Sequence, residues 1–343
     1  MKKSLIQICI LSMSVILVLG CRSNKRTQNT VEYKPSLISF LDSTTAAKAI
    51  IDDDSDGLYD QISKIEIEIQ MKKEKPFSNR DDALMAYKKF MAREVSPWQP
   101  KERDILLDVF QIVKKLCDTL SPRLFPGGIQ LIKVKTNHYG EDVYYTGNHN
   151  IFIPENIFPI KNEEALTSVM THEVFHILSR YNPELKHALY QLIGFQKAKK
   201  PVRLNEVLNK KLLTNPDGVS YQYVIGLDSI LAIPLITSKL SSYQSSKPAF
   251  FDYLNFDLYR IQDIGAYYEA VSDEAGNTTI PLKSTPEFFR KIKDNTRYVI
   301  HPDEIMADNF MLALQAYSSN DYSKFTKEGR ELIDNILKEI EKF

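Results

Sequence analysis

Hydrophobic residues recur at different intervals along the chain, and these intervals predict its secondary structure. Residues 57–73 and 80–94 place hydrophobic positions at helical spacing and predict amphipathic helices, with "SPWQP" at 96–100 ending this mainly helical stretch. Residues 102–120 show the same spacing and predict a further helix. Three short runs between residues 129 and 154 are rich in β-branched and aromatic residues and predict strands: "IQLIKVK", "DVYYTG" and "NIFIP".

The strongest helical pattern covers residues 162–182, "NEEALTSVMTHEVFHILSRYN". Asn162 can cap this helix, two glutamates occupy the favourable first turn, and "YNP" ends it. The second half of the chain mixes predicted strands, around residues 221–227 and 250–262, with a closing pair of helices, the last of which is a docking helix. The sequence therefore predicts an α+β fold in which a short mixed sheet packs on helix 162–182, with a helical N-terminal region and C-terminal helices.

The first residues have the pattern of an export signal. Lys2 and Lys3 precede a mostly apolar stretch from Leu5 to Leu19, which is shorter and more interrupted than the ~20 apolar residues of a membrane-spanning helix. The end, "VLGC", resembles the lipobox of bacterial lipoproteins, and this resemblance implies that Cys21 is lipidated and becomes the first mature residue. An uncleaved membrane anchor is the alternative, and both interpretations tether the protein to a membrane. We expect it in a bacterial cell envelope, facing away from the cytoplasm.

Shifts in composition suggest the domain boundaries. We expect a lipoprotein signal peptide at 1–20, a polar and basic tether at 21–30, a helical N-terminal region at 31–100 and the main domain at 101–343. The chain of 343 residues is 43% hydrophobic, which is enough to bury a sizeable core.

Charge and cysteine content exclude two classes of protein. The 44 basic residues balance 44 acidic ones, and no basic run is interleaved with aromatic residues, so we expect no nucleic-acid partner. Of the three cysteines, Cys9 lies in the apolar stretch and Cys21 at the lipid site, which leaves Cys117 alone in a hydrophobic helical pattern. The protein therefore has no internal disulfide framework, and Cys117 is expected in the core.

Residues 171–180, "THEVFHILSR", place two histidines four positions apart, with a glutamate directly after the first. On a helix, His172 and His176 lie about 40° apart around the axis, so both imidazoles can reach one metal ion. Hydrophobic residues of the same helix form a separate stripe, which would leave the histidines free to line a cleft. Glu173 follows closely enough to hold a water on the metal while remaining outside the ligand set. The alternative is a helix whose histidines make only surface hydrogen bonds.

This HExxH segment, with the strands before it and the exported setting, resembles the zincin metallopeptidases. The resemblance covers roughly residues 105–180 and 301–318, and it implies a zincin-like fold and a zinc cofactor. Catalytic zinc takes three protein ligands and keeps one position for water, so a third ligand must lie elsewhere. The metzincin pattern would need a histidine six residues after His176, where the chain has Asn182, so a carboxylate ligand of the gluzincin type is favoured.

Two segments carry the ExxxD spacing with which gluzincins supply a metal-binding glutamate and a supporting aspartate. "EAVSD", from Glu269 to Asp273, reads better as part of two strands joined by a turn than as a helix. "EIMAD", from Glu304 to Asp308, follows Pro302 at a favourable first helical position and lies opposite a hydrophobic stripe. We therefore predict that Glu304 binds zinc and that Asp308 orients a ligand histidine through its second nitrogen. A solvated helix face is the alternative for this pair, and Glu269 is the rival ligand.

Other polar segments have ordinary structural interpretations. "DDDSDG" at 52–57 resembles the opening of an EF-hand calcium loop, but its twelfth position is Ser63 instead of a glutamate, so an acidic turn is preferred. "TNPDG" at 214–218 lies in a part of the chain that could carry substrate pockets, but Thr214, Asn215 and Asp217 are interpreted as turn formers. Five further residues could donate hydrogen bonds to a transition state, and the sequence does not rank them: Arg203, Tyr221, Tyr223, Tyr298 and His301.

These features together indicate a lipid-anchored, zinc-dependent metallopeptidase. Its substrate would be a peptide or protein, hydrolysed by a water that zinc holds and Glu173 activates. The alternative function is a zincin-fold lipoprotein without catalysis, acting as a binding or assembly factor. The presence of Glu173 argues against that alternative, because a degenerate site commonly loses this residue.

Overall fold

The computed structural model describes residues 38–52, 57–160 and 162–343, all within one compact unit that extends from Pro35 to Phe343. The α+β class predicted from the sequence is confirmed, since these residues form helices and mixed sheets. The predictions for the signal peptide, the tether, Cys21 and most of the acidic segment 52–57 lie outside the described residues. Among the helices that are described, none combines the length and apolar character needed to cross a membrane.

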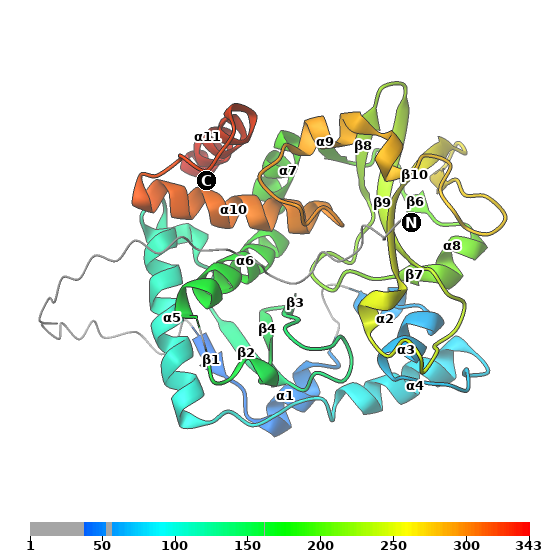
Figure 1. The fold of residues 1–343 in the computed structure, drawn as a ribbon, viewed down its shortest axis with the longest axis horizontal. Helices are drawn as coiled ribbons and strands as arrows, with labels where there is room; N and C mark the ends of the chain where they lie inside the picture. Colours follow the sequence, from blue (N-terminus) through cyan, green and yellow to red (C-terminus); the bar gives the residue numbers. More distant parts are fainter. Residues whose placement is uncertain (1–37, 53–56, 161) are drawn as a thin grey trace, which may run out of the picture. The chain divides into compact units, whose positions relative to one another are not determined.

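The first sheet lies next to the HExxH helix and has the strand order β1-β2-β4-β3 within the described residues (Figure 1). Its strands are β1 (Ile38–Phe40), β2 (Ile129–Val134), β3 (Tyr145–Gly147) and β4 (Asn150–Pro154). β2 runs parallel to β1 and β4, whereas β3 is antiparallel to β4 and forms the edge. The three predicted strands are present. β1 was not predicted, because its three residues show no period of their own and become a strand by pairing Ile38 with Ile129 of β2.

The N-terminal region is mainly helical, as predicted. Its helices are α1 (Ser43–Ala49), α2 (Leu58–Gln61), α3 (Lys64–Gln70) and α4 (Arg80–Met91). The predicted helix 57–73 is broken after Gln61, and Ser63 starts α3 by accepting a hydrogen bond from the Glu66 amide. An amphipathic helix was expected here, but Glu66 and Glu68 are buried together with the hydrophobic residues between them. The reason is that α3 contacts α4 as well as residues 206–213, so protein covers more than one of its faces.

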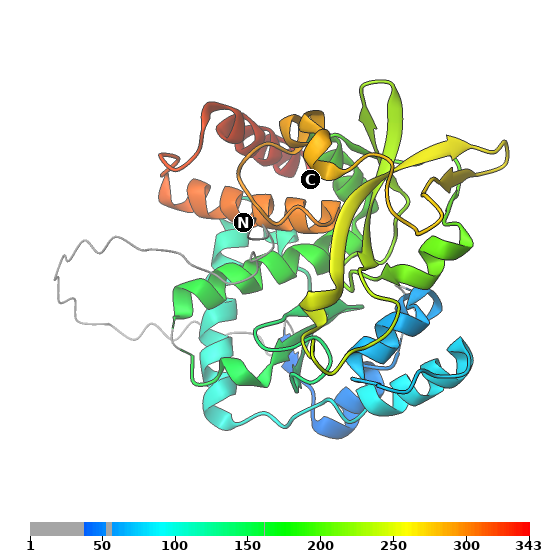
Figure 2. The same cartoon turned by 45° about the vertical axis from the view of Figure 1, so that its right-hand side comes forward.

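α6 (Glu163–Tyr181) is the predicted HExxH helix, and other helices contact it on several sides. Asn162 caps α6 by accepting a hydrogen bond from the Ala165 amide, as predicted. The neighbouring helices are α5 (Pro100–Asp118), α7 (Pro183–Leu192) and α10 (Pro302–Ser319). In Figures 1 and 2, α10 runs alongside α6. α11 (Lys327–Lys342) packs on α10 and α7 with its hydrophobic side chains buried, which confirms the predicted docking helix.

The second sheet, at the right of Figure 2, has the order β5-β8-β9-β10-β11-β6, with β7 also paired to β9. Its strands are β5 (Phe195–Lys197), β6 (Val202–Arg203), β7 (Leu212–Leu213), β8 (Tyr223–Leu227), β9 (Ile230–Ser238), β10 (Leu254–Asp263) and β11 (Tyr268–Ala270). The predicted strands at 221–227 and 250–262 correspond to β8 and β10, except that residues 250–253 form a 3-10 turn. The remaining short elements are α8 (Glu206–Lys211), α9 (Pro286–Ile292), η1 (Pro122–Leu124), η2 (Glu155–Ile157), η3 (Phe250–Tyr253) and η4 (Leu282–Ser284).

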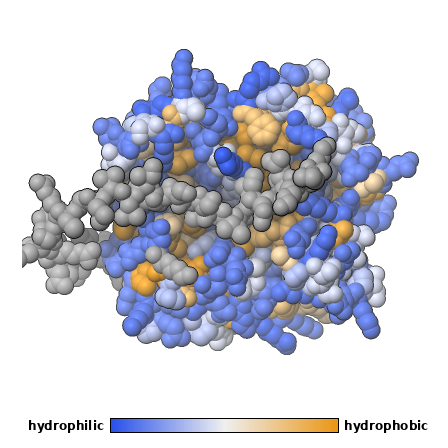
Figure 3. Space-filling view, viewed as in Figure 1, coloured by the Kyte–Doolittle hydropathy of each residue, from blue (hydrophilic) through white to orange (hydrophobic). Residues whose placement is uncertain are grey.

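Two hydrophobic clusters connect these elements. One joins the N-terminal helices to the first sheet, through residues such as Tyr87 and Phe152, and extends to Leu213 of the second sheet. The other packs α8, through Leu208, against the second sheet. Cys117 is buried in the core, as predicted. On the face drawn in Figure 3, polar residues cover most of the described surface and hydrophobic residues show between them.

Candidate metal centre

The two histidines of the HExxH segment project together from α6. Their ring centroids lie 4.8 Å apart, as the four-residue spacing predicted. The histidines were expected to be free to line a cleft, but they are largely buried: 11% of the His172 side chain and 0% of the His176 side chain are exposed, and Glu304 of α10 lies close to both rings. The buried surface of α6 is therefore wider than its hydrophobic stripe. Polar groups of α10, and not solvent, face the histidines.

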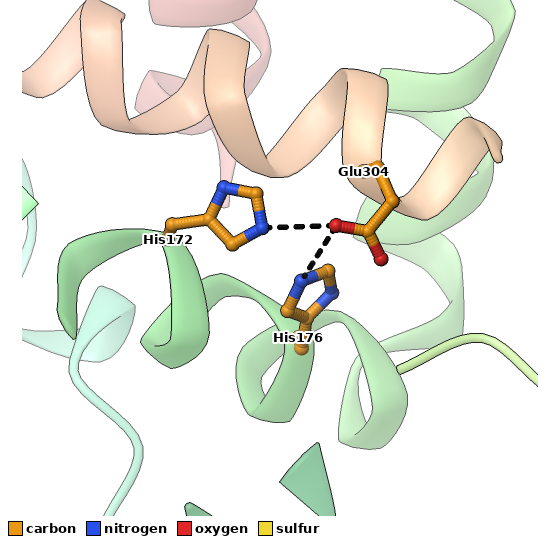
Figure 4. A group of neighbouring side chains, drawn as sticks. All are labelled: His172, His176 and Glu304. Atoms are coloured by element: carbon orange, nitrogen blue, oxygen red, sulfur yellow. Dashed lines mark hydrogen bonds and ion pairs between the residues drawn. The ribbon is translucent and has the colours of Figure 1, made fainter. Parts of the chain in front are cut away.

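α10 brings the predicted third ligand to these rings. Pro302 occupies the first position of the helix, and His301 caps it by accepting a hydrogen bond from the Asp303 amide. Glu304 follows in the first turn, with Oε2 3.1 Å from His172 Nε2 and 3.7 Å from His176 Nε2 (Figure 4). One ligand atom from each of the three residues lies within 4.8 Å of the others. His172, His176 and Glu304 are thus close enough to bind one metal ion.

The chemistry of the three side chains fits a cation. Both ring nitrogens of His176 are buried and have no hydrogen-bond partner among the described residues, an arrangement that is costly unless an ion or water satisfies them. Burial lowers the pKa of His176 to about 3, so its imidazole is neutral and has a free lone pair. Burial opposes ionisation of Glu304, but the neighbouring histidines outweigh it and lower the pKa to about 2. Two nitrogen donors and one carboxylate oxygen are a common zinc ligand set.

Asp308, the predicted supporting residue, lies one helical turn after Glu304. Its Oδ1 is 2.8 Å from His172 Nδ1, and its Oδ2 accepts a hydrogen bond from the hydroxyl of Thr296. Burial alone would lower the pKa of His172, but the hydrogen bonds to Asp308 and Glu304 outweigh burial and raise it well above its usual value. The two carboxylates therefore favour a positive charge at this imidazole, from either a proton or a metal ion.

The rival ligand lies in a different part of the fold. Glu269 belongs to β11, opposite Gln262 of β10, and its Oε2 is 3.4 Å from the Gln262 amide nitrogen. Asp273 follows in a turn, where its side chain accepts hydrogen bonds from the Ala275 and Asn277 amides. The first of the two expected strands and the turn are therefore present, but the second strand is not, because the residues after the turn make only isolated bridges, from Thr278 to Ser272 and from Ile280 to Leu258. Among the described residues, the groups close enough to share a metal do not include Glu269.

Residues 214–218, the TNPDG loop, contribute two site residues that sequence reasoning missed. Asn215 Nδ2 donates to Glu304 Oε1 at 2.8 Å. Asp217 Oδ1 accepts from the amide and hydroxyl of Thr146, on the edge strand β3, at 2.6 and 2.7 Å. The interpretation of Asn215 and Asp217 as turn formers was therefore incomplete. No sequence signal distinguishes them from an ordinary turn, because their role depends on proximity to residues about 70 to 90 positions away.

Glu173 lies close to both His176 and Asp217. Ligand atoms of these three residues are within 4.8 Å of one another, and Glu173 Oε2 is buried without a hydrogen-bond partner among the described residues. Burial raises the pKa of Glu173 to about 8, and the nearby Glu304 carboxylate adds to this while His172 opposes it. A carboxyl group with a pKa near neutrality can both accept and return a proton.

The five candidate hydrogen-bond donors are scattered. Tyr298 lies beside the site, with its ring centroid 6.3 Å from that of His172. His301 caps α10, Arg203 lies over the ring of Tyr267 at 4.3 Å, Tyr223 packs against Tyr190, and Tyr221 packs against the hydrophobic cluster of the second sheet. The structure thus places Tyr298 next to His172 and gives structural roles to the other four residues.

Comparison of the chain with protein-family models, with curated proteins and with solved structures finds no significant match.

Proposed function

We propose that this protein is a zinc-dependent metallopeptidase with a zincin-like arrangement. The observation that carries the proposal is the group formed by His172, His176 and Glu304, with Glu173 next to it in the chain. Two imidazole nitrogens and a single carboxylate suit zinc better than calcium or magnesium, which prefer oxygen ligands. The position of β3, at the edge of the first sheet and in contact with α6, supports the zincin-like arrangement.

Each residue would have a separate role in hydrolysis. When bound, zinc would supply a Lewis acid that polarises the scissile carbonyl. Glu173, buried and without a hydrogen-bond partner for Oε2 in the described residues, would take the proton of the attacking water and return it to the leaving amine. Asp308 would accept a hydrogen bond from His172 Nδ1, so that Nε2 faces Glu304 and the metal position.

The test of this function is the Glu173→Gln variant of the full chain. The amide keeps the shape of the side chain but cannot take a proton, so we expect the variant to retain zinc while hydrolysis of a peptide library falls by about 100-fold or more. Glu164→Gln, on the exposed first turn of the same helix, is the matched control and should leave hydrolysis unchanged. Unchanged turnover in Glu173→Gln would remove this residue from the mechanism.

The alternative function, a binding or assembly factor that does not catalyse, predicts a different result. Such a protein would need the metal ligands for its stability but no proton acceptor beside them. A wild-type chain that binds zinc and cleaves no member of the peptide library would favour this alternative.

We also propose that the protein acts outside the cytoplasm, held to a membrane by a lipid on Cys21. Only the sequence of residues 1–21 supports this location. Cys21→Ser should release or misprocess the protein, which fractionation of cells would show. A variant that is processed and retained in membranes like the parent would contradict the assignment.

A further inference from the structure

The TNPDG loop is held at one end by the N-terminal helices. Glu66, on α3, is 0% exposed, and its Oε2 accepts a hydrogen bond from the Thr214 amide at 2.8 Å. Ser63, which caps α3, donates to the carbonyl of Leu212 at 2.6 Å. Two residues at the start of α3 therefore fix the backbone immediately before Asn215.

Glu66 is itself held in one orientation. Gln70, one turn further along α3, donates its side-chain amide to Glu66 Oε1 at 3.1 Å, and the hydroxyl of Tyr87 on α4 donates to the Gln70 oxygen. Each carboxyl oxygen of Glu66 thus has a defined partner. Hydrogen bonds in a buried network are strong because solvent competes little for them, so these bonds hold the Glu66 carboxyl in place.

Asn215 connects this network to the proposed metal ligand. Its side-chain amide donates to Glu304 Oε1, whereas Oε2 of the same carboxylate faces His172 and His176. Asn215 and Glu304 are both buried, so solvent competes little for this hydrogen bond. The hydrogen bond fixes which carboxylate oxygen is turned toward the histidines.

We propose that Asn215 is a positioning residue for Glu304 and that Glu66 supports it through the Thr214 amide. The N-terminal helices would then be part of the support of the metal centre, although they contribute no ligand. This inference depends on the proposed function, because it assumes that Glu304 binds zinc. It accounts for two hydrogen bonds at neighbouring positions of the loop, from the Thr214 amide to Glu66 and from the Asn215 side chain to Glu304.

Zinc affinity of the full chain, measured by competition with a chromophoric chelator, tests the proposal. Asn215→Ala should weaken zinc binding by about 10- to 100-fold, the usual effect of removing a group that orients a ligand. Glu66→Ala should weaken it by about 2- to 30-fold, as an indirect effect. Glu66→Gln should bind zinc like the wild type, because its amide oxygen can still accept from the Thr214 amide.

Glu68→Ala is the matched control for loss of a buried glutamate. Glu68 lies on the same helix, but its Oε1 accepts from the Phe77 amide at 2.8 Å and from Lys64 at 2.7 Å, away from the loop. This variant should keep wild-type zinc affinity even if it is less stable. Urea unfolding without added zinc, followed by circular dichroism, confirms that each variant is folded before affinities are compared.

Different outcomes would refute the positioning role of Asn215 and Glu66 and the proposed zinc-dependent function. Wild-type zinc affinity in Asn215→Ala, or equal losses in Glu66→Ala and Glu68→Ala, would overturn the positioning role while leaving the zinc site intact. A wild-type chain that binds no zinc would overturn the proposed function and this inference with it.

Discussion

Replacing Glu66 by glutamine should change how the stability of the protein depends on pH. Burial raises the pKa of the Glu66 carboxyl from 4.5 to about 8, and the hydrogen bonds from Thr214 and Gln70 only partly oppose this effect. The folded protein therefore keeps a proton that the unfolded chain releases at a lower pH. Glutamine occupies the same volume and accepts the same backbone hydrogen bond, but it has no proton to lose.

The sign and size of the effect follow from this difference in pKa. The contribution of Glu66 to stability is fully present below pH 4.5 and is lost as the pH rises to about 8. The loss approaches about 1.4 kcal/mol for each pH unit, so across this window it is on the order of 4 to 5 kcal/mol. Above that window the contribution should not change further. The wild type should therefore lose stability relative to Glu66→Gln as the pH increases.

Urea unfolding of both proteins at several values between about pH 5 and about pH 8 measures this loss. Other titrating groups affect the two proteins alike, so the difference between their free energies of unfolding isolates Glu66. We expect that difference to shift steadily in favour of Glu66→Gln with rising pH. A difference that stays constant over the range would show that Glu66 is ionised in the folded protein, which would refute the reasoning.

Four further substitutions test individual contacts. Glu304→Ala should weaken zinc binding by about 100-fold or more, because it removes one of three proposed ligands. Glu269→Ala should leave zinc affinity unchanged in the same chelator competition. The reverse order of affinities would move the ligand to the segment from Glu269 to Asp273. Asp308→Ala should weaken binding less, by about 10- to 100-fold, and wild-type affinity would exclude a supporting role. Gly218→Ala should lower the free energy of unfolding by roughly 1 to 3 kcal/mol, because an added Cβ would lie 2.2 Å from Asp303 Oδ2. Unaltered stability in urea would show that this side chain yields easily.

The parts of the fold that local signals determine were predictable from the sequence. Helix α6 has a capping asparagine and acidic residues in its first turn, and both act over a single turn of chain. The choice of Glu304 over Glu269 also used local information, since Pro302 and the hydrophobic spacing indicate a helix while the other segment indicates strands and a turn.

The features that sequence reasoning missed depend on contacts between distant segments. β1 is a strand only because β2 pairs with it, and α3 is buried because three separate elements surround it. The burial of His172 and His176 likewise comes from α10, more than a hundred residues away in the chain. Asn215 is recognisable as a site residue only once its distance to Glu304 is known.

The zinc content of the full-length chain is the measurement that tests the central claim most directly. After dialysis against zinc and removal of the unbound metal, elemental analysis should find about one zinc per wild-type chain. His172→Ala and His176→Ala should each lose the ion, because two remaining ligands hold zinc poorly. Retention of zinc at the wild-type ratio in both variants would show that the metal binds elsewhere in the protein. That result would contradict the proposed zinc site.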